Sequence, residues 1–128
     1  MDNFFIAATV TSPEIDFRFD QNLLSLKGES YPENAAAFYA PVIEQLNTWL
    51  ASCAAELITV DVSLTYFNSS STKMLFSVFD ALDRAASSGK QVLVNWYRDE
   101  EDETILEFGE ELQIDFTAIK FNDCPVAS

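Results

Sequence analysis

Residues 57–71, "LITVDVSLTYFNSSS", run from a stretch rich in apolar, β-branched and aromatic side chains into one asparagine and three serines. Up to Phe67 the pattern has a period of two, which is typical of a half-buried β-strand. One face would carry Ile58, Val60, Val62, Leu64 and Tyr66, and the other Leu57, Thr59, Asp61, Ser63 and Thr65. We therefore predict one continuous strand over 57–67.

A helix is predicted to follow the serines, over about residues 70–87. Gly89 is placed to end it, because glycine readily adopts the left-handed conformation that often follows a helix. "QVLVNWY", residues 91–97, predicts the next strand. The apolar residues of the helix recur at spacings of three and four, as on the buried face of an amphipathic helix: Met74, Leu75, Val78, Phe79, Leu82 and Ala86.

Two elements are predicted before this unit. The alternation within residues 14–27 predicts a β-hairpin, and a long helix follows it. Ser30 and Glu33 have the spacing of a capping box, and Pro32 would lie in the first turn of the helix. The apolar pattern of this helix contains Pro41, so the helix either kinks there or begins later.

The two ends of the chain complete the predicted fold. Residues 4–10 are expected to form a strand or an ordered arm, residues 99–111 to begin a third helix, and residues 116–122 to form a last strand. Strands that alternate with helices require crossover connections and a largely parallel sheet. We predict an α/β fold in one domain over 1–128, with its core at about 11–122: a mixed sheet with an N-terminal hairpin and three helices packed on it.

The composition argues against several classes of function. The 128 residues carry a formal net charge of −14 and no histidine. Such a charge repels phosphate backbones and anionic lipids, so neither a nucleic acid nor a membrane is an expected partner. Ser-His and Cys-His nucleophiles are excluded, and the three glycines are isolated rather than gathered in a phosphate-binding loop. We expect no enzyme activity, no metal and no cofactor.

The expected location is the cytoplasm. The chain has two cysteines, Cys53 and Cys124, too few for a disulfide framework. It shows no signal-peptide pattern and no apolar run long enough to cross a membrane. We expect the free protein to be a monomer.

Two motifs besides the serines were candidates for chemistry. Residues 99–111 contain eight acids, which is typical of a solvated helix start where the dipole favours negative charge. Paired carboxylates in a small acidic enzyme or ligand-binding domain, or a mimic of nucleic acid, remain alternatives. Trp96 and Tyr97 would face opposite sides of a strand, one in the core and one near the edge of the sheet where functional sites gather.

The serine motif has two interpretations from its residues alone. Asn68, Ser69 or Ser70 could cap the helix by accepting a hydrogen bond from a first-turn amide, which stabilises a helix by about 1 kcal/mol. The same free amides and the helix dipole would also stabilise a phosphate. A phosphoserine would add close to two negative charges at one surface position, enough to block a matched partner.

Four segments, "TSPEIDF", "LSLKGESYPENAAAFYAPV", "TYFNSSSTKML" and "VNWYRDEEDE", make the chain resemble the SiaC family of bacterial regulatory phosphoproteins. The resemblance implies a fold similar to STAS domains, the anti-sigma-factor antagonists, and a regulatory role without enzyme activity. It also implies three protein partners: a dedicated protein kinase, a PP2C-type phosphatase and a diguanylate cyclase (GGDEF) protein. The unphosphorylated protein would activate the cyclase, raise cyclic di-GMP and promote biofilm formation.

The family motif "N-[ST]-S-S" implies that the phosphoacceptor is the hydroxyl residue directly after the asparagine, here Ser69. Ser70 and Ser71 are adjacent alternatives, and with Asn68 they would shape the loop that a partner contacts. A second part of the partner surface is expected at residues 31–34, whose other interpretation is simply a helix start: Tyr31, Pro32, Glu33 and Asn34. A partner-switching role with a target other than a cyclase also stays open.

Overall fold

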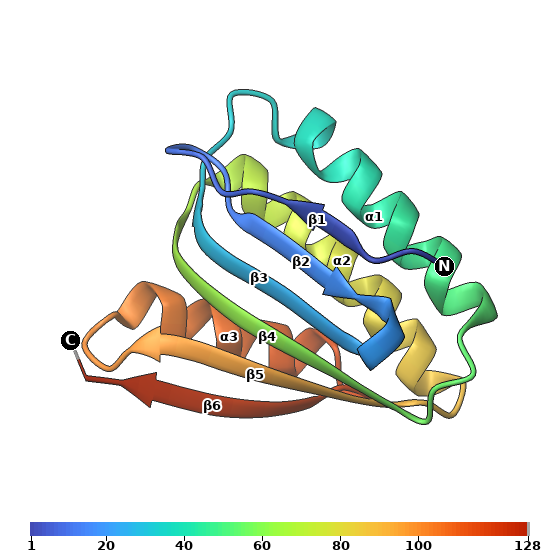
Figure 1. Cartoon of the computed structure of the whole chain (residues 1–128). Helices are drawn as coiled ribbons and strands as arrows, with labels where there is room; N and C mark the ends of the chain where they lie inside the picture. The colour runs from blue at the N-terminus through green and yellow to red at the C-terminus, as the bar shows by residue number, and fades with distance from the viewer. Residues whose placement is uncertain (128) are drawn as a thin grey trace.

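The computed structural model describes residues 1–127 and has two layers, a six-stranded sheet and three helices packed on one of its faces (Figure 1). The strands lie in chain order across the sheet: β1 (Phe4–Ile6), β2 (Glu14–Arg18), β3 (Leu23–Ser30), β4 (Leu57–Phe67), β5 (Gln91–Asp99) and β6 (Lys120–Val126). The helices are α1 (Ala35–Ser52), α2 (Ser69–Ser87) and α3 (Glu103–Asp115), and a short 3-10 turn, Phe19–Gln21, joins β2 to β3.

The sheet is mixed, as predicted. β1, β2 and β3 are antiparallel neighbours, and β3, β4, β5 and β6 are parallel. Each helix connects one parallel strand to the next, so all three helices cover the same face of the sheet (Figure 1). None of the helices within residues 1–127 is both long and apolar enough to cross a membrane.

β4 spans 57–67, as predicted, and the uncovered face of the sheet is polar around it. Its buried face packs under the helices through Ile58, Val60, Val62 and Leu64. Tyr66, predicted on the same face, is 51% exposed, because the pairing with β3 shifts register between Gly28 and Glu29, and Phe67 packs against the core instead. On the uncovered face, Asn95 Nδ2 donates to Asp61 Oδ1 at 2.9 Å, and Asn122 Nδ2 donates to Asn95 Oδ1 at 3.1 Å. This row of hydrogen bonds across β4, β5 and β6 allows the face to stay in water without a second layer of helices.

The helix start predicted at Ser30 is wrong. Ser30 is the last residue of β3, and α1 begins only at Ala35. The N-cap is Asn34, whose Oδ1 accepts a first-turn amide at 3.0 Å. A residue that precedes a proline avoids helical backbone, so Pro32 keeps Tyr31 out of the helix and delays its start.

Boundaries elsewhere also differ from the prediction. β1 is shorter, and α1 begins later than predicted but still runs through Pro41, which lies on its exposed side. The last strand begins at Lys120 and extends to Val126, beyond the predicted end at residue 122. Phe116 and Ile119 do not belong to it, because they are buried residues of the turn that follows α3.

Three buried hydroxyl groups connect β3, α1 and α2. Ser30 Oγ donates to Ser71 Oγ at 2.9 Å and lies 2.7 Å from Tyr39 OH, and all three residues are 0% exposed. Because the single hydroxyl hydrogen of Ser30 goes to Ser71, Tyr39 must donate to Ser30. We call these three residues the hydroxyl chain. Loss of one member would leave a buried polar group unsatisfied, which costs about 1–3 kcal/mol.

Helix α3 lies close against β5 at Gly109. The indole of buried Trp96 donates from Nε1 to the carbonyl oxygen of Ile105 at 3.0 Å. A Cβ atom at position 109 would lie 2.7 Å from this Nε1 atom, closer than non-bonded atoms approach. A residue without a side chain is therefore needed where the helix crosses the indole ring.

We expect Gly109→Ala to lower the free energy of unfolding by about 1–3 kcal/mol, because the new methyl group must displace the Trp96 ring from a filled core. Urea denaturation measures this change. Glu110→Ala, at the exposed neighbouring position, is the control and should shift stability by less than about 0.5 kcal/mol. Alanine forms helix better than glycine, so a Gly109→Ala variant as stable as the parent would show that the contact is not tight.

The hydroxyl chain predicts a loss of stability at high pH. Burial raises the pKa of the Tyr39 hydroxyl above its ordinary value, and the hydrogen bond with Ser30 lowers it by less. The stabilisation by neutral Tyr39 is complete below the unfolded-chain pKa of about 10, and is lost as pH rises through the higher folded pKa. Tyr39→Phe should cost about 1 kcal/mol at neutral pH and remove this part of the alkaline decline.

Denaturant titrations between neutral pH and pH about 11 measure this decline. The control is Val42→Ala, a change at another buried position of α1, which should lower stability equally at every pH. An alkaline decline of the same steepness in Tyr39→Phe and in the parent would refute the assignment to Tyr39.

Candidate functional site

The strongest candidate region is the edge of the sheet where β3, β4 and β5 end. Because these strands are parallel, the helices that follow them all begin at this edge (Figure 1). Each helix is capped by a side chain that accepts an amide hydrogen bond at 2.9–3.0 Å. The caps are Asn34 for α1, Asn68 for α2 and Asp102 for α3. Such an edge of a sheet is a common place for functional sites in open α/β folds.

The serine motif forms the cap and first turn of α2. Asn68 is the N-cap and accepts the Ser71 amide at 2.9 Å. Ser69 and Ser70 are exposed, whereas Ser71 faces inward as a member of the hydroxyl chain. The amide of Asn68 donates to the carbonyl oxygen of Ser30 at 3.0 Å, so the motif is attached to the end of β3.

The first turn of α2 offers donors to an anion. The amides of Ser69, Ser70 and Ser71 have no helical acceptor, because a helical amide bonds to the residue four positions earlier. The Asn68 side chain accepts a hydrogen bond only from the Ser71 amide. The other two amides lie at the positive end of the helix dipole, beside the exposed Ser69 hydroxyl. This arrangement would stabilise a phosphate on that hydroxyl.

The segment 31–34 lies at the end of β4, the strand that leads directly into the serine motif. The Tyr31 ring packs edge-on against Tyr66, with the ring centroids 5.7 Å apart. Pro32 is half-buried, and Glu33 and Asn34 are exposed. The structure thus places Tyr31 beside the strand that leads into Ser69, while the Asn34 side chain acts as a helix cap.

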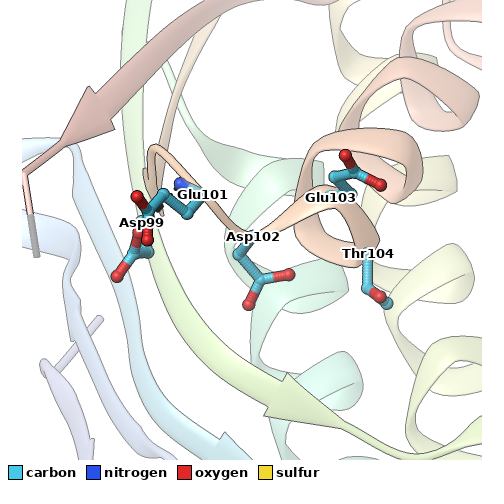
Figure 2. Close-up of a pocket in the computed structure, with 5 residues that line it drawn as sticks. All are labelled: Asp99, Glu101, Asp102, Glu103 and Thr104. Carbon is cyan, nitrogen blue, oxygen red and sulfur yellow. Dashed lines mark hydrogen bonds between the residues drawn. The ribbon is translucent and has the colours of Figure 1, made fainter.

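The acidic loop between β5 and α3 lines an open hollow (Figure 2). Two of its carboxylates accept backbone amides: Asp99 Oδ1 accepts from Glu101 N–H at 2.9 Å, and Asp102 Oδ1 accepts from Ile105 N–H at 3.0 Å. In Figure 2 the Glu103 carboxylate points away from that of Asp102. Across residues 1–127, no three His, Cys, Asp or Glu side chains are grouped so as to hold a metal ion. The loop has the geometry of a solvated helix start.

Trp96 and Tyr97 lie on opposite faces of β5, as predicted. Trp96 belongs to the core, and Tyr97 is half-buried on the uncovered face, where the charge of Asp61, more than burial, raises the pKa of its hydroxyl. Arg98 donates to both carboxylate oxygens of Asp123, at 2.8 and 2.9 Å, and this bond lowers the pKa of Asp123. The ion pair therefore holds β6 against β5.

The sequence reasoning missed the hydroxyl chain, although Ser71 had a signal. Ser71 lies four residues before Leu75 and seven before Val78, and both are buried. Extending this spacing by one turn towards the N-terminus would have placed Ser71 on the inner face. Tyr39 offered no such signal, because an aromatic residue on the buried face of a helix is ordinarily a core residue.

Comparisons with known proteins agree with this architecture. An uncharacterized protein of Pseudomonas aeruginosa (strain UCBPP-PA14) is 32% identical over 115 residues, which cover 90% of each chain. The crystal structure of apo-SiaC from P. aeruginosa matches with a TM-score of 0.88 at 29% identity, over 97% of this chain and 99% of that one.

A chain of another P. aeruginosa crystal structure, the diguanylate cyclase SiaD in complex with its activator SiaC, matches with a TM-score of 0.88 at 28% identity. This match covers 96% of the present chain and 99% of the other. The family model described as "SiaC family regulatory phosphoprotein" matches residues 6–126. Because this match spans nearly the whole chain, including the α2 serine motif, the chain belongs to the SiaC family of regulatory phosphoproteins.

Proposed function

We propose that this chain is a phosphorylation-switched activator of a diguanylate cyclase. The unphosphorylated form binds and activates the cyclase, and so controls cyclic di-GMP and biofilm formation from the cytoplasm. A protein kinase phosphorylates Ser69, and a PP2C-type phosphatase removes the phosphate. The proposal is carried by the likeness, over 96% of this chain, to a structure of SiaC bound to the cyclase that it activates.

The exposure of the serines supports Ser69 as the acceptor. Ser71 is 0% exposed, so its hydroxyl cannot enter a kinase active site without local unfolding of α2. A phosphate on Ser69 would meet the free first-turn amides. Ser69 also lies four residues before exposed Lys73. At this spacing in a helix, a negative group attracts a following positive side chain.

The surroundings of Ser69 suggest how the phosphate would weaken binding. Tyr66, 51% exposed, forms with Tyr31 an aromatic pair at the same edge of the sheet. Aromatic side chains of this kind often anchor protein interfaces. A phosphate placed beside such a contact would have to lose its water without gaining a matched partner, which is unfavourable. The switch would therefore change affinity without refolding the domain.

Phosphorylation by the cognate kinase with ATP, followed by mass spectrometry, tests the acceptor. We expect one phosphate, on Ser69, because Ser69 is exposed at the helix start. Ser69→Ala should abolish the modification. Ser70→Ala, the matched change at the next exposed serine, should retain it. Phosphate that persists in Ser69→Ala at the parent level would disprove the assignment.

Cyclase activation tests the partner. Purified diguanylate cyclases of the source organism are assayed for conversion of GTP to cyclic di-GMP, with and without this chain. The parent and Ser69→Ala should activate one of them, because neither carries an added negative charge at position 69. Ser69→Glu should bind that cyclase at least about tenfold more weakly, because it brings an unpaired charge to the contact.

Ser77→Glu is the control, since it adds the same charge at an exposed position two turns further along α2. It should activate as the parent does. If no cyclase responds although Ser69 is phosphorylated, the target of the switch is another class of protein. If Ser69→Glu activates as well as Ser77→Glu, the charge at Ser69 is not the switch.

A further inference from the structure

We infer that the hydroxyl chain, Tyr39–Ser30–Ser71, determines which serine of the motif is phosphorylated. It does so by fixing the rotation of the first turn of α2, so that Ser69 is the outermost hydroxyl. This inference rests on the proposed function and adds three positioning residues to it.

The helical geometry orders the three serines. Successive residues of an α-helix are rotated by about 100°. With Ser71 pointing at the core, Ser70 points about 100° away and Ser69 about 160° away, nearly opposite. The observed exposure follows this order, because Ser71 is fully buried, Thr72 is half-buried, and Ser69 and Ser70 are exposed. By this rotation, Ser69 points furthest from the direction of Ser71.

The three consecutive serines have identical side chains, and the spacing of the apolar residues of α2 indicates only that Ser71 is the inward one. The structure adds the buried hydroxyl group to which the inward serine is hydrogen-bonded. Ser30 provides it, through the 2.9 Å bond from its Oγ to Ser71 Oγ. Its carbonyl oxygen also accepts the Asn68 amide at 3.0 Å, so one strand residue holds both ends of the motif.

Tyr39 fixes the orientation of Ser30. Its hydroxyl lies 2.7 Å from Ser30 Oγ and donates a hydrogen bond to it. The hydrogen of Ser30 is therefore directed to Ser71 rather than shared with Tyr39. The buried apolar residues of α2 begin at Leu75, and in the turn before them the buried residue is Ser71, which bonds to Ser30.

Two measurements on Ser30→Ala, Tyr39→Phe and Ser71→Ala test the inference. The first needs no kinase: amide hydrogen exchange over residues 69–75, with far-UV circular dichroism to show that each variant is folded. We expect exchange of the Ser71 and Thr72 amides to be about fivefold faster in the Ser30 and Tyr39 variants, because one buried hydrogen bond is lost. Ser77→Ala, the same kind of change at an exposed position of α2, should leave this exchange unchanged.

The second measurement is the distribution of phosphate among the serines after treatment with the kinase. In the parent and in Ser77→Ala we expect phosphate on Ser69 alone. In Ser30→Ala and Tyr39→Phe, the ratio of phosphate on Ser70 and Ser71 to that on Ser69 should rise about fivefold over the parent ratio or its detection limit. In Ser71→Ala, phosphate should appear on Ser70.

The outcomes separate this inference from the proposed function. Phosphate confined to Ser69 in all three variants, or unchanged amide exchange, overturns the role of the hydroxyl chain and leaves the switch intact. A parent protein that takes no phosphate on Ser69 overturns both. Tyr39→Phe retains the ring and its packing, so a shift of phosphate in that variant cannot be assigned to a lost core contact.

Discussion

Parallel pairing of β3, β4 and β5 is the constraint on which the site depends. It brings the ends of three strands, and the starts of the three helices that follow, to one edge of the sheet. Each helix start carries free amides and the positive end of a dipole, and each is closed by an asparagine or aspartate cap. Only α2 also places an exposed hydroxyl at its first residue, which makes this start suitable for a covalent anion.

Capping and switching use the same chemistry and do not exclude each other. Asn68 accepts one first-turn amide and leaves those of Ser69 and Ser70 free. A phosphate on Ser69 would therefore complete the capping of α2 rather than disrupt it. Since the buried side of the turn is held by Ser71 and Ser30, a phosphate on Ser69 would change the surface and leave the core unchanged.

The fold was largely predictable because its strongest elements have unambiguous periods. β4 alternates from Leu57 to Leu64, and α2 carries one apolar stripe and is followed closely by Gly89, whose φ is +115°. The start of α1 was not predictable from the spacing of Ser30 and Glu33, because Ser30 pairs with Phe67 as the last residue of β3 and is not available to cap a helix. Capping rules consider only residues that are close in sequence, so they take no account of such a long-range strand pairing.

The site was predictable to the level of the motif and no further. A serine motif at a helix start is visible in the sequence, and the apolar spacing of α2 indicates that Ser71 faces inward, but its hydrogen-bond partner Ser30 lies forty-one positions earlier in the chain. Likewise, the contact of Tyr31 with Tyr66 exists only because β3 and β4 end together. Residues that are distant in sequence thus supply the contacts of Ser71 and of Tyr66, and a local pattern does not name these contacts.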